Sequence, residues 1–159
     1  MIYYIVRIKH TMSSTPDNEI YSSRHLKVPV AVAYAAFANA KHLQQWWGPE
    51  GFTNTFHEFD LRPGGKWTLT MHGPEKGHYE NDSVFTVVEP ERLVAWTRLS
   101  QPLFDMEVGF ESVDDTHSRI SFRMVFATAE LCEKMRPFVV PKNEENFDRL
   151  ERELVNVLA

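Results

Sequence analysis

Histidines are the first candidates for a chemical role in this sequence, because an imidazole can ligate a metal or transfer a proton near neutral pH. The 159-residue chain carries seven of them: His10, His25, His42, His57, His72, His78 and His117. No two stand four residues apart, as the ligands of a helical zinc site do, and the single cysteine adds no thiolate pair. We therefore expect no metal site and no cofactor.

His72 and His78 are the pair best placed for acid–base chemistry. They flank a turn predicted at residues 73–77, so a hairpin would bring the two rings together. A histidine at the edge of a cavity can titrate near neutral pH. Catalysis by one of these two side chains is therefore a hypothesis, and simple solvent exposure is the alternative.

Four other charged side chains lie on predicted strands. They are Arg98, Asp105, Glu107 and Arg123. Each alternates with apolar residues, so we expect each to face solvent, although Trp96 shares a face with Arg98. The sequence contains no Gly-x-Ser-x-Gly nucleophile motif, phosphate-binding glycine loop or dinucleotide-binding motif.

Aromatic and methionine side chains are more suggestive, since aromatic residues make up 13% of the chain. Adaptable methionines and large rings suit both cores and ligand pockets. The candidate cavity residues are Trp47, Trp67, Leu69, Met71, Phe85, Trp96, Phe104, Met106, Phe122, Met124, Phe138, Phe147 and Leu150. Because one β-bulge exchanges the two faces of a strand, the division between core and cavity stays open.

Composition bounds the class of protein. A hydrophobic content of 43% in 159 residues predicts one globular domain. The net charge of -5 and the pI of about 5.8 argue against nucleic acid as a partner, and no apolar run is long enough to span a membrane. Cys132 cannot form an internal disulfide, which indicates a reducing compartment and a cytoplasmic location.

The first 18 residues form a separate segment in this interpretation, and the domain covers residues 19–159. Residues 1–8 are apolar and suit an extra strand. Alternatively, Met12 begins the protein, because the polar residues that follow it resemble an ordinary start.

Hydrophobic periodicity predicts the elements that must position these side chains. Strands are expected at Glu19–Val28, Thr55–Leu61, Lys66–His72, Tyr79–Glu89, Arg92–Leu99, Phe104–Val113 and Arg119–Phe126, with helices at Val30–Ala38 and Lys41–Trp46. Two further helices are expected at the end, capped by Thr128 and Asn143, and Glu145 and Arg149 form an i,i+4 pair on the last. Strands joined by tight turns predict an antiparallel sheet of an α+β fold, covered by the terminal helix.

Four motifs in this order resemble a known family: residues 46–49 (Trp-Trp-Gly-Pro), 60–67, 89–94 and 147–150. The sequence from about Glu19 to Leu158 is similar to the activator of heat-shock-protein-ninety ATPase homologues, in the START-like (SRPBCC) superfamily. The resemblance implies a helix-grip fold, in which a curved antiparallel sheet wraps around a long C-terminal helix and leaves a cavity between them. In residues 139–142 the chain differs from the family, which often has a glycine-bearing linker there.

The resemblance implies three functions. The first is binding of a small hydrophobic, aromatic or lipid-like molecule in the cavity. The second is a cavity enzyme of cyclase or hydrolase type, using His72 or His78. The third is an interaction module that acts with a chaperone. The oligomeric state and the ligand stay open.

In such a fold the adjacent Trp46 and Trp47 would divide their roles. One indole would seal the core and the other would border the mouth of the cavity, because adjacent side chains point in different directions. The alternative is that both pack between helix and sheet.

Overall fold

The structure, a computed structural model, describes residues 17–159. Most of the predicted N-terminal extension at residues 1–18 lies outside the described residues. The choice between Met1 and Met12 as the first residue, and the position of His10, lie outside them as well.

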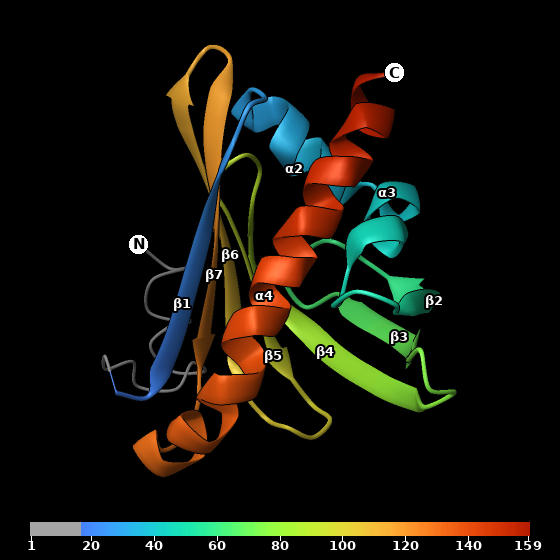
Figure 1. The fold of residues 1–159 in the computed structure, drawn as a ribbon, viewed down its shortest axis with the longest axis vertical. Helices are drawn as coiled ribbons and strands as arrows, with labels where there is room; N and C mark the ends of the chain where they lie inside the picture. Colours follow the sequence, from blue (N-terminus) through green and yellow to red (C-terminus); the bar gives the residue numbers. More distant parts are fainter. Residues whose placement is uncertain (1–16) are drawn as a thin grey trace.

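One antiparallel sheet of seven strands forms the body of the described chain, and a long helix crosses it (Figure 1). The strands are β1 (Glu19–Leu26), β2 (Thr53–Phe59), β3 (Lys66–His72), β4 (His78–Glu89), β5 (Leu93–Arg98), β6 (Asp105–Asp114) and β7 (His117–Val125). Their order across the sheet is β1-β7-β6-β5-β4-β3-β2. Strands β2 to β7 pair with their neighbours in sequence, as the tight turns predicted, and β1 pairs with β7.

Two short helices, α2 (Val30–Ala38) and α3 (Ala40–Trp46), follow β1. Pro29 is the N-cap of α2, at the end of the helix where the missing N–H is not needed. Asn39 ends α2 and begins α3, and its side-chain oxygen accepts a hydrogen bond from the backbone N–H of Lys41 at 3.0 Å.

The C-terminal segment is one helix, α4 (Ala129–Leu158), so the prediction of two helices was wrong. Thr128 caps it as predicted, but Asn143 lies in its interior and is buried. Pro137 and Pro141 fit within the helix because proline has a helical φ. Each removes one N–H donor, and kinks commonly occur at such positions. Figure 1 shows the first turns of α4 bending away from the axis of the rest.

The main hydrophobic core lies between the concave face of the sheet and the helices. A β-bulge between Phe85 and Val87 exchanges the faces of β4 at that point. Phe85 therefore contributes to the main core, whereas Val87 joins a separate small cluster with Leu93 and Ala95.

The predicted α+β class and helix-grip architecture are confirmed: a curved open antiparallel sheet, two short helices after the first strand and a long C-terminal helix. No helix within residues 17–159 has the length and apolarity that a membrane crossing requires.

Candidate functional site

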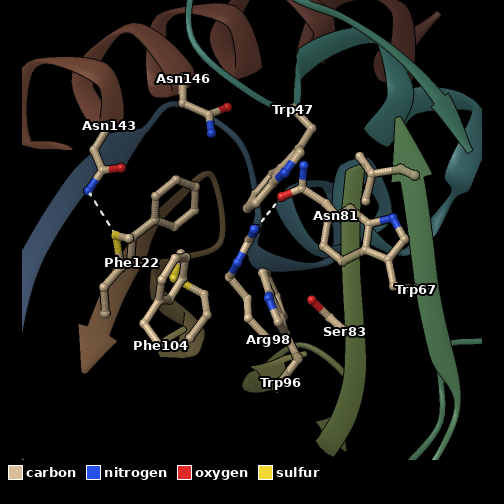
Figure 2. A pocket seen from close by; sticks show the side chains of 13 residues that line it. Trp47, Trp67, Asn81, Ser83, Trp96, Arg98, Phe104, Phe122, Asn143 and Asn146 are labelled. Atoms are coloured by element: carbon tan, nitrogen blue, oxygen red, sulfur yellow. Dashed lines mark hydrogen bonds between the residues drawn. The ribbon is translucent and has the colours of Figure 1, made fainter. Parts of the chain in front are cut away.

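A pocket with two connected parts lies between the concave face of the sheet and α4, and Figure 2 shows the inner part. The inner pocket has a volume of about 90 Å³, and the outer groove has a volume of about 590 Å³. Asn81, Arg98 and Phe104 line both parts, so the groove leads into the pocket. From the groove a ligand would meet the sheet on one side and α4 on the other.

Tryptophan rings form much of the inner wall. The ring centroids of Trp47 and Trp67 are 5.2 Å apart, those of Trp67 and Trp96 are 5.1 Å apart, and Phe122 lies 5.6 Å from Trp47. Most of these pairs are tilted or edge-to-face, as aromatic rings prefer. The wall is therefore large, apolar and well packed.

The adjacent Trp46 and Trp47 differ in position: Trp46 is buried in the core, as expected for one of the two, whereas Trp47 lines the inner pocket and not the groove at its mouth. Trp46 is fully buried, and its indole N–H donates to the Ala36 carbonyl at 2.9 Å, so it joins α3 to α2. Trp47 is the C-cap residue of α3, partly exposed, and lines the inner pocket. The end of the helix turns the second ring out of the core and into the pocket wall.

Arg149 of α4 holds the loop that follows Trp47. Its guanidinium donates to the backbone carbonyls of five residues, at 2.8 to 3.0 Å: Gln45, Trp47, Gly48, Pro49 and Phe52. Burial lowers the pKa of Arg149, and nearby Glu50 opposes that effect. Gly48 has a φ of +95°, and a Cβ there would lie 2.7 Å from the terminal methyl group of Met71. The Trp-Trp-Gly-Pro motif is therefore a turn fixed against α4.

Arg98 brings a charge into this aromatic pocket. Its guanidinium donates to the Asn81 side-chain oxygen, the Ser100 hydroxyl and the Gln101 and Pro102 carbonyls. Burial lowers the pKa of Arg98, and the more distant Asp82 raises it. The expectation that Arg98 faces solvent was wrong, because it shares the concave face with Trp96.

Two asparagines of α4 face Arg98 from the opposite side of the pocket (Figure 2). Asn143 donates to the Ser22 hydroxyl at 3.3 Å. The side-chain oxygen of Asn146 is buried and accepts no hydrogen bond from residues 17–159, and the residue is only 6% exposed. The inner pocket thus combines aromatic walls with amide, hydroxyl and guanidinium groups.

Comparison with known proteins identifies the family. Residues 27–155 match the family described as Activator of Hsp90 ATPase homolog 1-like protein. The chain belongs to this family. The resemblance predicted from the four motifs is confirmed.

Solved structures of other members of the fold agree with this assignment. A protein from Nitrosomonas europaea superposes with a TM-score of 0.82 at 20% identity, covering 90% of this chain and 97% of its own. A protein from Arthrobacter aurescens gives 0.79 at 17% identity, covering 92% of each chain. The AHSA1 protein from Silicibacter pomeroyi gives 0.69 at 19% identity, covering 86% and 97%. These likenesses show the fold, and no curated protein matches the sequence.

The structure brings together most of the residues predicted for the cavity. Those lining the inner pocket are Trp47, Trp67, Leu69, Trp96, Phe104, Met106, Phe122 and Met124. Met71 and Phe138 line the outer groove, whereas Phe85, Phe147 and Leu150 are buried in the core. Asn81, Ser83, Asn143 and Asn146 were not predicted. Asn81 and Ser83 precede Phe85 at intervals of two residues on the same strand, so alternation alone would have placed them on the same face as Phe85.

His72 and His78 form a close pair on the other face of the sheet. Their Nδ1 atoms are 2.7 Å apart, and the His72 Nε2 atom lies 2.8 Å from the Thr55 hydroxyl. His72 and His78 are paired across β3 and β4 on the side away from Met71 and Tyr79, which line the groove. The predicted approach of the two rings is therefore found, but neither ring lines the pocket. In the described part of the chain no three potential ligands gather as a metal site.

The remaining charged residues predicted to face solvent are more enclosed than expected. Asp105 is only 4% exposed and accepts a hydrogen bond from the Thr97 hydroxyl at 2.8 Å. Arg123 forms ion pairs with Glu19 at 2.8 Å and with Glu107 at 3.0 Å. All lie on the face of the sheet opposite the pocket, so they contribute nothing to its lining.

Proposed function

We propose that this protein binds a small molecule with an apolar, aromatic or lipid-like body between its sheet and α4. The observation that carries the proposal is the aromatic pocket opening into a groove. The groove volume of about 590 Å³ falls in the range of about 300 to 1,000 Å³ usual for ligand sites. The lining also has the usual composition of such sites, with many apolar side chains and a few polar ones.

The polar groups inside the pocket support this proposal over a purely structural role. Asn81, Ser83, Asn143 and Asn146 are each less than 10% exposed but line the pocket. Asn81 and Asn143 already have hydrogen-bond partners, but the buried Asn146 oxygen accepts no hydrogen bond within residues 17–159. An unpaired polar atom in a core costs free energy, so a core selected for stability alone would have an apolar side chain at this position. The presence of Asn146 favours an occupant that hydrogen-bonds to it.

The chemistry of these groups favours binding over catalysis. The inner pocket presents amides, one hydroxyl and one guanidinium, which orient a ligand by hydrogen bonds. General acid–base catalysis usually relies on His, Asp, Glu, Lys, Tyr or Cys. The two histidines of the enzyme hypothesis lie on the opposite face of the sheet, which gives that hypothesis less support.

Native mass spectrometry of the protein purified from its own host tests the proposal. We expect an added mass of a few hundred daltons, the size of a ligand that fills about 300 to 1,000 Å³, which organic extraction removes. The variant Asn146→Phe is designed to block the pocket, because it places a ring there from α4. It should abolish the added mass, while an unchanged circular dichroism spectrum shows that the variant is folded. An unliganded mass for the wild type, together with no uptake of added aromatic or fatty acids, would contradict the proposal.

A further inference from the structure

Arg98 stands at the junction of the inner pocket and the outer groove, where an entering ligand would pass it. Its Nε–H, both Nη2–H groups and one Nη1–H have acceptors, which come from Asn81 and from residues 100–102. These bonds fix the guanidinium in one orientation. One Nη1–H of its five donors remains without an acceptor among the described residues.

The charge of Arg98 lacks a partner in direct contact. No carboxylate within residues 17–159 lies within 4.0 Å of its nitrogens, and Asp82 acts on it only at longer range. The ring centroid of Phe104 is 5.2 Å from the guanidinium carbon, an arrangement typical of a cation–π contact. A partly buried cation without an anion is costly, so an anion placed here would offset that cost.

The groups around Arg98 suit a hydrogen-bond acceptor. Figure 2 shows the guanidinium pointing into the space between Trp47, Trp96 and Phe104, with the Asn146 amide on the far side. The Ser83 hydroxyl and the Asn146 amide also line this pocket, and each can donate a hydrogen bond. Lys142 adds a second positive charge at the groove.

We infer that the ligand is an amphipathic acid, whose carboxylate binds Arg98 and whose apolar body lies against the tryptophan wall. This inference rests on the proposed function, because it names the chemical class of the molecule bound there. A carboxylate supplies both the missing acceptor and the missing charge, whereas a neutral amide or alcohol supplies only the acceptor. Charge-assisted hydrogen bonds are stronger than neutral ones, so the acid should bind more tightly than its amide.

The test compares 2-naphthoate with 2-naphthamide, which share one aromatic body and differ in charge. Quenching of tryptophan fluorescence reports binding, because three of the four tryptophans line the pocket. We expect the wild type to bind the acid about tenfold more tightly than the amide. Arg98→Gln should remove this preference and leave the affinity for the amide nearly unchanged. Lys134→Gln, a control on an exposed part of α4 outside the pocket, should retain the preference for the acid.

Each outcome decides between the two proposals. Equal binding of acid and amide by the wild type would overturn this inference and leave the proposed function standing. Failure of both compounds to bind, repeated with decanoate and decanamide, would overturn both proposals. If Arg98→Gln does not fold, Arg98→Lys keeps the charge but lacks the planar fork of donors, so it should keep only part of the preference for the acid. A fully retained preference in Arg98→Lys would overturn the assignment to the guanidinium.

Discussion

The two halves of α4 contact the rest of the molecule in different ways. In residues 143–158, Phe147 and Leu150 are fully buried in the core and Arg149 holds the loop after Trp47. In residues 129–142, Phe138 is 64% exposed and Val140 is 40% exposed. The first half carries both prolines and borders the outer groove.

This difference suggests that one part of α4 stabilises the fold and the other controls access of a ligand to the groove. The second half fixes α4 to the sheet and to α3, so its loss would expose the core. The first half buries Cys132 and Val139, but it borders the groove with the mostly exposed Phe138. It also lacks two helical N–H donors because of Pro137 and Pro141. We therefore expect changes in the second half to alter folding and changes in the first half to alter binding.

The largest effect is expected for Phe147→Ala. The Phe147 ring is fully buried, 4.5 Å from the ring of Phe122 and beneath the Arg24 guanidinium. Removing a buried phenyl group leaves a cavity and lowers the free energy of unfolding by about 3 to 5 kcal/mol. Urea denaturation followed by circular dichroism measures this change. A loss below about 1 kcal/mol, the mean for ordinary substitutions, would mean that the second half of α4 does not anchor the fold.

A smaller but still clear effect is expected for Arg149→Met. The variant keeps much of the side-chain volume but leaves five backbone carbonyls without their donor. We expect a loss of about 2 to 3 kcal/mol in the free energy of unfolding, together with a shift of tryptophan emission as Trp47 loosens. Chemical denaturation and fluorescence spectra measure the two effects.

Arg152→Met is the matched control for Arg149→Met. Arg152 is one turn away on the same helix, and its ion pair with Glu50 is exposed. An exposed pair contributes about 0 to 1 kcal/mol, so this variant should unfold almost as the wild type does. Equal losses in the free energy of unfolding for the two variants would show that the five carbonyl contacts of Arg149 contribute no more to stability than one exposed ion pair does.

The sequence predicted the elements better than the contacts between them. Alternation placed Trp67 and Leu69 on one face of their strand, because period two is a local property of a strand, and the structure places that face in the pocket together with Trp96 and Phe122. The i,i+4 pair of Glu145 with Arg149 was also a local prediction, and it was wrong. Arg149 instead reaches a loop about one hundred residues away in sequence, a contact that helical spacing cannot reveal.

The polar part of the pocket was not predicted either, because it also depends on contacts between different elements. A charged residue that alternates with apolar ones normally faces solvent, so Arg98 was expected outside. Its inward position depends on acceptors from the turn after β5 and from Asn81 on the neighbouring strand. Such partners are known only once the register of β4 and β5 is known.

The smallest effect on stability is expected for Phe138→Ala, in the first half of α4. The Phe138 side chain is mostly exposed, and alanine has the higher helix propensity, so the free energy of unfolding should stay within about 0.5 kcal/mol of the wild-type value. Because Phe138 lines the outer groove, decanoate should bind a few-fold more weakly. Calorimetric titration and urea denaturation measure these two quantities on the same sample.

Val155→Ala is the matched control on the second half of α4. Val155 is 69% exposed and lies away from the groove, near His25 and Leu158. Its replacement should also leave the free energy of unfolding nearly unchanged, and it should leave decanoate binding unchanged as well. A loss of more than about 1 kcal/mol in the free energy of unfolding of Phe138→Ala would contradict the comparison, because the first half of α4 would then contribute to stability. Equal weakening of decanoate binding by both variants would contradict it as well, because Val155 lies outside the groove.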